Sequence, residues 1–554
     1  MSPRGLASHS RRREASRFIL GDFDVTEAAG APPAHSGGVA TVGCPGDRRP
    51  AEPPGRGRVR SKARLCQSRR GDATAGDGAG LWRRGLASRL RLPPRRRNPV
   101  TAERPPVPAH GVSFGEALRV WARVALLSFG GPAGQIAVMH RILVDEKRWI
   151  GERRFLHALN FCMLLPGPEA QQLATYLGWL MHRTAGGLAA GLLFILPGAV
   201  SILALSGLYV LYGDLPVVEA LFFGLKAAVL VVVVQALIRL GGRTLRTGLA
   251  RALAAAAFLA IYAFSAPFPL IVLAAALTGL LAARLDPGVG GSAHGAEASD
   301  AERVPGEGAP DHARPRLGWA LRISAVLLVL WLAPVLALGL GLGWDHVFTQ
   351  IAVFFSKLAV VTFGGAYAVL AYVAQAAVET HGWLSPGEMI DGLGLAETTP
   401  GPLIMVTQFV GFLAAFRGET GLPPLLAGVI GAALTTWVTF TPCFLWIFLG
   451  APYVEALRRV RALSAALSAV SAAVVGVILN LALWFGARVL FSDVGTFAIG
   501  PLSLDAPRLA SLQPVSLVLV AASGLAAWRL RLGVLPLIGG AAAAGTLAHL
   551  AGLA

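Results

Sequence analysis

From residue 113 onward, apolar stretches long enough to cross a lipid bilayer follow one another along the sequence. Each helical crossing needs about 20 predominantly apolar residues. Charged residues make up only 14% of the chain and the mean hydropathy is +0.60, whereas an average soluble domain has about 25% charged residues. The pattern therefore predicts an all-α polytopic membrane protein.

Two kinds of apolar stretch occur in this part of the chain. The uninterrupted candidates lie at 187–212, 216–240, 249–266, 268–284, 317–343, 423–449, 462–484, 512–529 and 533–552. The others are interrupted by Gly and Pro, and lie at 113–142, 155–182, 346–377 and 389–416. Because Gly and Pro break helices, we expect broken or re-entrant helices in this second group.

The net charge of +18 is concentrated at the N-terminus. Residues 1–110 contain 22 Lys and Arg against 9 Asp and Glu, and the remaining 444 residues contain 27 against 22. This segment is rich in Arg, Pro and Gly and buries too little apolar surface to offset the entropy of folding. We expect either a disordered tail or a start codon assigned too far upstream. Only three aromatic residues lie among the 22 Lys and Arg of this segment, too few to form a stacking surface, so we expect no nucleic-acid binding.

The rest of the chain is an internal duplication. A shift of 234 residues aligns Phe114 to Pro168 with Phe348 to Pro402 without a gap, and 12 of the 55 pairs are identical. The identities include Gly, Pro and Trp, which chance does not place in register. The predicted organisation is a tail at 1–110, a first repeat at 111–284, a polar linker at 285–316, and an extra span plus second repeat at 317–554.

Basic loops suggest how the two repeats are oriented. The loop around Trp149 carries Arg141, Lys147, Arg148, Arg153 and Arg154, whereas its counterpart around Trp383 has no Lys or Arg. Since basic loops favour the cytoplasmic side, we expect inverted repeats, with the span at 317–343 reversing the second. Inverted repeats with broken helices near the midplane are typical of transporters. A duplication kept in parallel remains the alternative.

The interruptions recur in pairs and predict where a ligand binds. One pair is Ser128-Phe129-Gly130-Gly131 with Thr362-Phe363-Gly364-Gly365, and the other is Pro166-Gly167-Pro168 with Pro400-Gly401-Pro402. The start of a half-helix offers free N–H groups and partial positive charge, which suit an anion. We therefore assign these residues, with Gln171, Gln172 and Gln408, to substrate binding. The alternative is that the glycines only allow close helix packing.

Charged residues near the interruptions complete the predicted site. Arg123 and Lys357 each stand five residues before the Ser or Thr of a break. A cation within an apolar helix usually faces the protein interior or a water-filled cavity, so we expect both to bind substrate, and their replacement by Gln to abolish transport. Extension of their side chains to the lipid headgroups is the alternative. Glu169 and Glu397 are candidates for proton coupling or, equally, structural carboxyl groups.

The motifs of enzymes and pumps are missing from the sequence. No lysine follows a glycine, so the phosphate-binding GxxxxGK[ST] loop is absent. No HExxH motif or Cys/His metal cluster marks the chain as an enzyme, and the four cysteines lack metal-ligand spacing. We expect no enzymatic activity, no cofactor and no metal site.

The quoted motifs resemble the chromate ion transporter family. In the first half the resemblance rests on Ser128 to Pro132, Glu146-Lys147-Arg148-Trp149 and Leu165 to Pro168. In the second it rests on Thr362 to Gly365, His381-Gly382-Trp383-Leu384 and Thr399 to Pro402. The similarity covers about residues 113–552 and matches the long form, in which two homologous halves are fused with opposite orientation.

This resemblance implies a multi-pass protein of the bacterial plasma membrane that exports chromate and confers chromate resistance. The implied partners are chromate or sulfate as transported ligand and the lipid bilayer, with a homodimer left open. Sulfate or another oxyanion as the true substrate, and an anion channel, are the alternatives. The second half lacks the basic Trp loop and the proline after its glycines, so we expect the two halves to share the work unequally.

Overall fold

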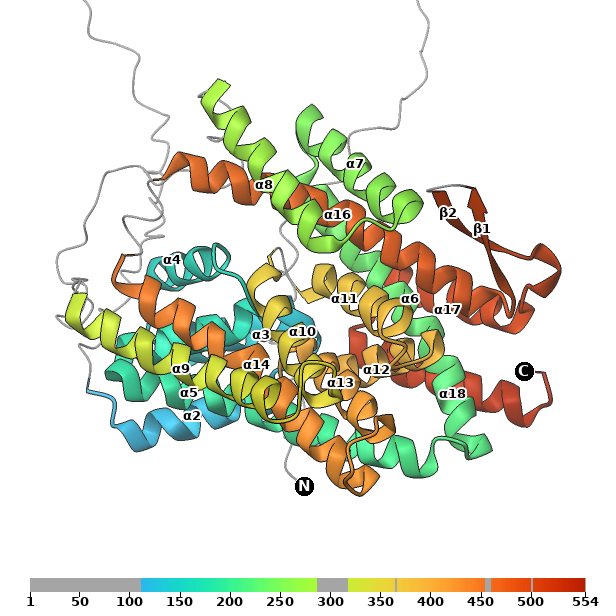
Figure 1. Ribbon diagram of the computed structural model, residues 1–554, viewed down its shortest axis with the longest axis horizontal. Helices are drawn as coiled ribbons and strands as arrows, with labels where there is room; N and C mark the ends of the chain where they lie inside the picture. The colour runs from blue at the N-terminus through green and yellow to red at the C-terminus, as the bar shows by residue number, and fades with distance from the viewer. Residues whose placement is uncertain (1–110, 286–316, 364–365, 454–459, 500–501, 554) are drawn as a thin grey trace, which may run out of the picture. The chain divides into compact units, whose positions relative to one another are not determined.

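The computed structural model describes residues 111–285, 317–363, 366–453, 460–499 and 502–553. These residues are almost entirely helical (Figure 1). The predicted tail at 1–110 lies outside the described residues, as does the linker from residue 286 to 316.

The first repeat begins with two helices that divide the interrupted stretch 113–142. In order, the helices are α2 (Phe114–Leu127), α3 (Gly131–His140), the π-helical turn η1 (Arg141–Glu146), α4 (Glu152–Cys162), α5 (Glu169–Tyr212), α6 (Pro216–Thr244), α7 (Gly248–Phe264) and α8 (Phe268–Leu285). The long helix α5 is itself kinked, because His182 and Arg183 have non-helical dihedral angles. It therefore contains the end of the interrupted stretch 155–182 and the span predicted at 187–212.

The second repeat follows an additional helix and has the same order of elements. The additional helix is α9 (Leu317–Gly341). The elements that follow it are α10 (Val347–Val361), α11 (Ala366–Ala374), η3 (Gln375–Thr380), α12 (Pro386–Thr398), η4 (Leu403–Met405), α13 (Val406–Arg417), α14 (Pro424–Gly450), η5 (Ala451–Tyr453), α16 (Arg461–Leu490), β1 (Val494–Ile499), β2 (Leu502–Pro507), η6 (Leu509–Ser511), α17 (Pro514–Arg529) and α18 (Val534–Leu550).

The duplication seen in the sequence extends to fine detail of the backbone. The π-helical turns η1 and η3 are related by the 234-residue shift. After each turn the backbone N–H of a tryptophan donates to an equivalent backbone carbonyl, from Trp149 to Leu143 at 2.9 Å and from Trp383 to Ala377 at 2.8 Å. The two repeats thus keep one backbone design although few of their side chains are the same.

Local sequence signals explain where the helices begin. The side chain of Ser113 accepts a hydrogen bond from the N–H of Glu116 at the start of α2, and Ser385 forms a reciprocal capping box with Glu388 at the start of α12. Such caps satisfy N–H groups that have no partner within the helix. Proline opens α6, α14 and α17, where its missing N–H costs nothing.

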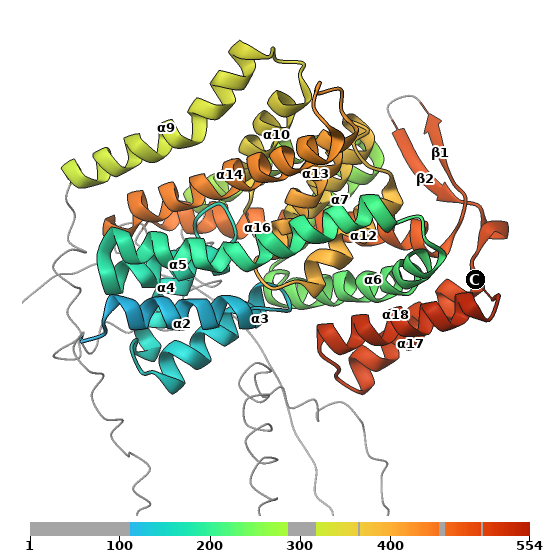
Figure 2. The same cartoon turned by 90° about the horizontal axis from the view of Figure 1, so that it is seen from below.

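Helices of the two repeats pack against one another. Within the first half α2 runs beside α5 (Figure 2), and within the second half α9 runs beside α14 (Figure 1), whereas α14 also packs on α5 of the first repeat. Helix α18 packs on α6, and α16 packs on α6, α7 and α8. The first and second repeats therefore share one buried core, to which both contribute.

The predicted all-α polytopic architecture is confirmed. Among the described residues, six helices are long and apolar enough to cross a membrane: Glu169–Tyr212, Pro216–Thr244, Phe268–Leu285, Gly318–Gly341, Pro424–Tyr453 and Ala462–Leu490. One small addition was not expected: β1 and β2 form an antiparallel hairpin that pairs Val494 with Pro507. Its β-branched and aromatic residues favour strands, and the stretch is too short to span a bilayer as a helix.

Candidate functional site

The four interruptions meet in pairs, and each pair joins one repeat to the other. The N–H of Gly401 donates to the carbonyl of Ser128 at 2.9 Å, and the N–H of Gly167 donates to the carbonyl of Thr362 at 2.8 Å. These four residues correspond under the 234-residue shift, so the two hydrogen bonds are equivalent. When two units are related by a two-fold axis, each contact between them occurs twice with the roles of the units reversed. The two hydrogen bonds have this reciprocal form.

Ser128 and Thr362 end their helices in the same way. The Ser128 hydroxyl donates to the Val124 carbonyl at 2.7 Å, and the Thr362 hydroxyl donates to the Leu358 carbonyl at 2.6 Å. Both residues are buried and have ψ angles of 81° and 85°, outside the helical range. The chain thus leaves the helix at this residue, and its carbonyl is free to bond across the repeats.

The glycine of each Pro-Gly-Pro triplet has a backbone that disfavours a side chain. Gly167 has φ +124° and Gly401 has φ +101°, a region that residues with a Cβ rarely adopt. Space is also short: a Cβ on Gly167 would lie 2.9 Å from Cys443 Sγ, and one on Gly401 would lie 3.0 Å from Gly198 Cα. Each triplet therefore packs against a long helix of the other repeat, just after a proline at 442 or 197.

Helices start directly after both triplets without a side-chain cap. Pro168 precedes α5 and Pro402 precedes η4, and neither has a side chain that accepts a hydrogen bond from the first turn. The first N–H groups of a helix have no partner within it. The geometry therefore leaves backbone donors and the positive ends of helix dipoles beside the inter-repeat hydrogen bonds, an arrangement that favours an anion.

The glutamines after the first triplet present oxygens rather than amide nitrogens. Both side chains are fully buried. Gln172 Nε2 donates to the Pro166 carbonyl at 2.6 Å, and Gln171 Nε2 donates to Thr175 Oγ1 at 3.1 Å. Neither amide can be flipped without loss, because the Pro166 carbonyl only accepts and the Thr175 hydroxyl already donates to the Gln171 carbonyl. Their Oε1 atoms accept no hydrogen bond from the described residues. The amide nitrogens are thus engaged by Thr175 and by the Pro166 carbonyl, and the part of the two glutamines in substrate binding stays a prediction.

Two residues that the motifs did not include complete the junction. Gln135 of α3 is buried and donates to the Gly401 carbonyl at 2.5 Å. Tyr367 of α11 donates to Glu397 Oε1 at 2.6 Å, and its hydroxyl lies 3.8 Å from the position of a Cβ on Gly131. Glu397 is 1% exposed and its second carboxylate oxygen has no hydrogen-bond donor among the described residues. Gln135 and Tyr367 could have been found in the sequence as polar side chains inside the apolar stretches 113–142 and 346–377.

The expected burial of the two cations is wrong. Arg123 and Lys357 are both exposed on the outer faces of α2 and α10. Arg123 Nη1 pairs with Glu146 Oε2 at 2.9 Å, so its charge is directed toward the loop around Trp149 and away from the breaks. The helical period places positions 123 and 128 on different faces of the helix. The equal spacing of Arg123 from Ser128 and of Lys357 from Thr362 therefore did not imply that these cations face the breaks. Their part in substrate binding stays a prediction.

Other predicted residues differ in how they are placed. Gln408 is bonded at both ends, since it donates to the Ala199 carbonyl and accepts from Thr436, and it links α13 to α5 and α14. Glu169 is the first residue of α5 and is half-buried. Phe129 and Phe363 are partly buried beside the breaks, whereas Gly364 and Gly365 lie outside the described residues.

The two Trp loops differ in chemistry although their backbones match. Lys147 lies 5.5 Å from the centre of the Trp149 ring and pairs with Glu116 at 3.1 Å. At the equivalent position, His381 stacks on Trp383 with ring centres 4.2 Å apart. Partial burial and the neighbouring Lys357 lower the pKa of His381. The first loop therefore carries a cation at this position, whereas the second carries an imidazole whose neutral form is favoured.

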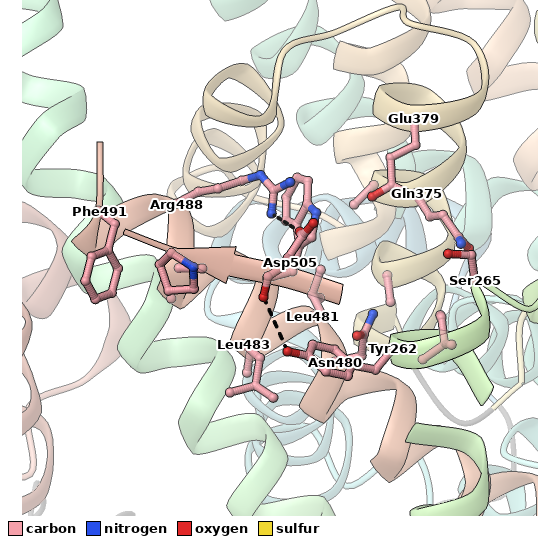
Figure 3. A pocket seen from close by; sticks show the side chains of 18 of the residues that line it. Tyr262, Ser265, Gln375, Glu379, Asn480, Leu481, Leu483, Arg488, Phe491 and Asp505 are labelled. Carbon is pink, nitrogen blue, oxygen red and sulfur yellow. Dashed lines mark hydrogen bonds and ion pairs between the residues drawn. The ribbon is translucent and has the colours of Figure 1, made fainter. Parts of the chain in front are cut away.

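A cavity of about 520 Å³ lies elsewhere, between α7, η3, α16 and β2 (Figure 3). Arg488, a cation that lines this cavity, already has partners: it pairs with Asp505 at 3.0 Å and lies 4.1 Å from the centre of the Trp484 ring. In Figure 3, Asp505 lies between Arg488 and Tyr262, whose hydroxyl donates to the Asp505 carbonyl at 3.5 Å. None of the residues predicted to bind substrate lines this cavity, so it is separate from the breaks.

Comparison with known proteins identifies the family. The chromate transporter family model matches residues 115–280 and 349–546. The chain belongs to the chromate transporter family. The two matched segments fall within the two repeats, as expected for the long, two-repeat form. The chain is accordingly a multi-pass protein of the plasma membrane, and family membership supports chromate transport as its activity.

Named relatives cover most of the chain. A probable chromate transport protein of Synechococcus elongatus is 27% identical over 427 residues, which are 75% of this chain and 96% of the relative. A chromate transport protein of Pseudomonas aeruginosa is 30% identical over 447 residues, which are 78% and 96%. One of Cupriavidus metallidurans is 27% identical over 375 residues, which are 64% and 78%. No solved structure matches the chain.

Proposed function

We propose that this member of the family is a secondary transporter that exports chromate across the plasma membrane and so confers chromate resistance. The observation that carries the proposal is the pair of equivalent hydrogen bonds from Gly401 to Ser128 and from Gly167 to Thr362. Broken backbone inside a membrane is tolerated where it is buried in protein or lines a cavity. Here four such breaks come together from two repeats.

The proposed binding groups are backbone donors at the ends of half-helices. Uncapped helix starts after Pro168 and Pro402 supply N–H groups and partial positive charge. These suit a tetrahedral dianion, and the flanking residues Ser128, Gly131 and Thr362 hold the backbone in place. Sulfate has the same shape and charge, so we expect it to compete with chromate.

The repeats are proposed to lie in the membrane with opposite orientations. The reciprocal contacts at the breaks support a two-fold axis between the repeats, and the alternation of basic loops supports an axis in the membrane plane. Alternating access then follows from rocking one repeat against the other. In one state the Gly401–Ser128 contact would close one side of the membrane, and in the other state the Gly167–Thr362 contact would close the opposite side.

The membrane potential is sufficient to drive export. One charge crossing 100 mV is worth about 2.3 kcal/mol, so a dianion leaving an inside-negative cell gains about 4.6 kcal/mol. Since 1.4 kcal/mol is a factor of ten, this supports a gradient of roughly a thousandfold. Uniport and proton exchange both satisfy this energetic requirement.

For proton coupling we propose Glu397, with Glu169 as the second candidate. Glu397 is buried at the junction, and beside Tyr367 one of its carboxylate oxygens accepts no hydrogen bond from the described part of the chain. A carboxyl group at such a place exchanges a proton with the environment only when the junction opens. Replacement of Tyr367 by Phe should therefore change how chromate flux responds to a pH gradient, with a smaller effect on flux driven by potential alone.

Arg123 and Lys357 are proposed to attract the anion before it binds. Both are exposed near the Trp loops, which would lie at opposite faces of the membrane if the repeats are inverted. Charges of this kind raise the local anion concentration and lose their effect as salt is added.

Flux in proteoliposomes tests the proposal. Purified protein should give saturable chromate flux that follows the membrane potential and is competed by sulfate. Currents that never saturate would indicate an anion channel, and absence of chromate flux would contradict the assigned substrate.

A further inference from the structure

A lysine inside the membrane-spanning helix α6 has no place in the site described so far. Lys226 is the only cation in the segment from Ala220 to Ile238, and the helix around it is apolar and long enough to span. A charged residue at such a position is costly and is retained for function. In contrast to Arg123 and Lys357, the Lys226 side chain is only 29% exposed.

The partner of Lys226 belongs to the other repeat. Its Nζ lies 3.3 Å from Oδ1 of Asp391 in α12, and this contact lacks the alignment of a hydrogen bond. The other carboxylate oxygen, Oδ2, accepts from the hydroxyl of Tyr209 in α5 at 3.1 Å. The Asp391 side chain is 6% exposed. An acid of the second repeat is thus held between a cation and a hydroxyl of the first.

The surroundings of Lys226 favour an anion over a permanent ion pair. Its Nζ lies 3.6 Å from the position of a Cβ on Gly387, the second residue of α12, where the helix dipole is positive. The nearby acid Glu388 is already bound by both terminal nitrogens of Arg417. Asp391 is therefore the carboxylate that neutralises Lys226, and the contact between them is the weaker of the two ion pairs.

From this geometry we propose that Lys226 binds the transported oxyanion and that Asp391 competes with the oxyanion for it. The inference rests on the proposed transport function. In the described state the ammonium group faces Asp391. When an oxyanion arrives, it takes the place of the carboxylate at Lys226, and Asp391 keeps the hydrogen bond from Tyr209. The cation that the oxyanion requires is thus kept neutralised between transport cycles by an acid of the opposite repeat.

A purely structural ion pair predicts the opposite response to mutation, which makes the proposal testable. Breaking a buried pair by removing one partner leaves an uncompensated charge and is damaging, whereas removing both partners is often harmless. In a competitive arrangement, removal of Asp391 alone improves anion binding. Removal of both Asp391 and Lys226 abolishes anion binding, because the cation that holds the anion is gone.

The experiment measures sulfate binding and chromate flux in the full-length protein. Sulfate is the binding probe, and its effect is read from the rise in thermal unfolding temperature of the purified protein. We expect Asp391→Asn to lower the sulfate concentration for the half-maximal rise by about tenfold, the size expected for loss of one competing charge interaction. Lys226→Gln and the double variant Lys226→Gln/Asp391→Asn should both lose the response, and Lys226→Arg should keep it.

The double variant decides the result, because it leaves no unpaired charge that prevents folding. A double variant with wild-type sulfate response and wild-type chromate flux would show a structural pair and overturn the proposal. Arg322→Gln, which removes an exposed cation from α9, is the matched control and should leave both measurements unchanged. A wild-type protein without chromate flux overturns the proposed function itself, whereas wild-type flux that persists in Lys226→Gln overturns this inference alone.

Discussion

The two repeats share a backbone frame and differ in the side chains placed on it. The breaks, the π-helical turns and the hydrogen bonds at both tryptophans coincide under one shift of 234 residues. The polar side chains at the junction do not coincide. Gln135 of the first repeat corresponds to Val369, and Tyr367 and Glu397 of the second correspond to Ala133 and Met163.

This difference separates two requirements of the protein. Equivalent breaks are needed if the two repeats exchange roles during transport, so the backbone geometry is kept in both. A polar or ionisable group that acts once per cycle needs only one copy. The backbone therefore remains symmetric while the side-chain chemistry is divided between the repeats.

The largest expected effect comes from the symmetric part. Gly167→Val and Gly401→Val each place a side chain at a positive φ where the nearest atoms leave no room. Each should abolish chromate flux, and to the same extent, because the two positions are equivalent. Vesicle flux normalised to the amount of folded protein measures this.

Gly382 provides the control for that experiment. It also has positive φ, at +62°, but no atom of the described residues lies within 4 Å of the position of its Cβ. Gly382→Ala should cost about 1 kcal/mol of stability and leave flux intact. Full activity in one of the two valine variants would show that the breaks are not functionally equivalent.

A smaller effect is expected from the asymmetric side chains. Gln135→Val gives the first repeat the residue of the second and leaves the buried Gly401 carbonyl without its side-chain donor. Loss of such a donor costs about 1–3 kcal/mol, so the initial rate of flux should fall by about 5-fold to 150-fold. Ala133→Ser, at the exposed counterpart of Tyr367, should have no effect. An unchanged rate in Gln135→Val would remove Gln135 from the junction's functional groups.

The ion pairs beside the two Trp loops should stabilise the folded protein to different extents. Glu388 of the second repeat accepts hydrogen bonds from both terminal nitrogens of Arg417, whereas Glu116 of the first repeat forms one exposed pair with Lys147. Arg417→Gln should lower the Tm by an amount equivalent to about 1 kcal/mol, and Lys147→Gln by less than about 0.5 kcal/mol.

The effect of Arg417 should depend on pH. Partial burial raises the pKa of Glu388, but the hydrogen bonds from Arg417 outweigh it and hold the pKa below its ordinary value of 4.5. A lowered pKa stabilises the folded state above the ordinary value, and that stabilisation is lost as the pH falls through the lowered value. The difference in Tm between wild type and Arg417→Gln should therefore shrink under acid conditions. A constant difference would contradict the ionic origin.

The smallest effects are expected for the two exposed cations. Arg123→Gln and Lys357→Gln should raise the KM for chromate by only a few fold, and added salt should reduce the difference, as for long-range attraction. Kinetics at low and high ionic strength measure this. Complete loss of flux in either variant would restore the original prediction that these side chains bind substrate directly.

Much of the fold was predictable because its signals are local. Apolar length defined the spans, and paired Gly and Pro defined the breaks, so the predicted stretch 113–142 divides at Phe129 as α2 and α3 require. The hairpin from Val494 to Pro507 was missed, since a short β-branched segment between two long apolar stretches gives little signal.

The site was predictable only in its backbone. A shared sequence offset located Ser128, Thr362, Gly167 and Gly401, but it could not show that each bonds to the opposite repeat, because that depends on how the repeats pack. The same offset led to a wrong expectation of burial for Arg123 and Lys357. Which face of a helix a side chain occupies depends on neighbouring helices, and these neighbours partly cover Lys226 instead.

The most direct test of the account is chromate flux in proteoliposomes at a fixed membrane potential, compared between wild type, Gly167→Val and Gly401→Val. The account predicts saturable, potential-driven flux in the wild type and its loss in both variants. Chromate flux that survives in both variants, or a folded wild-type protein that moves no chromate, would contradict it.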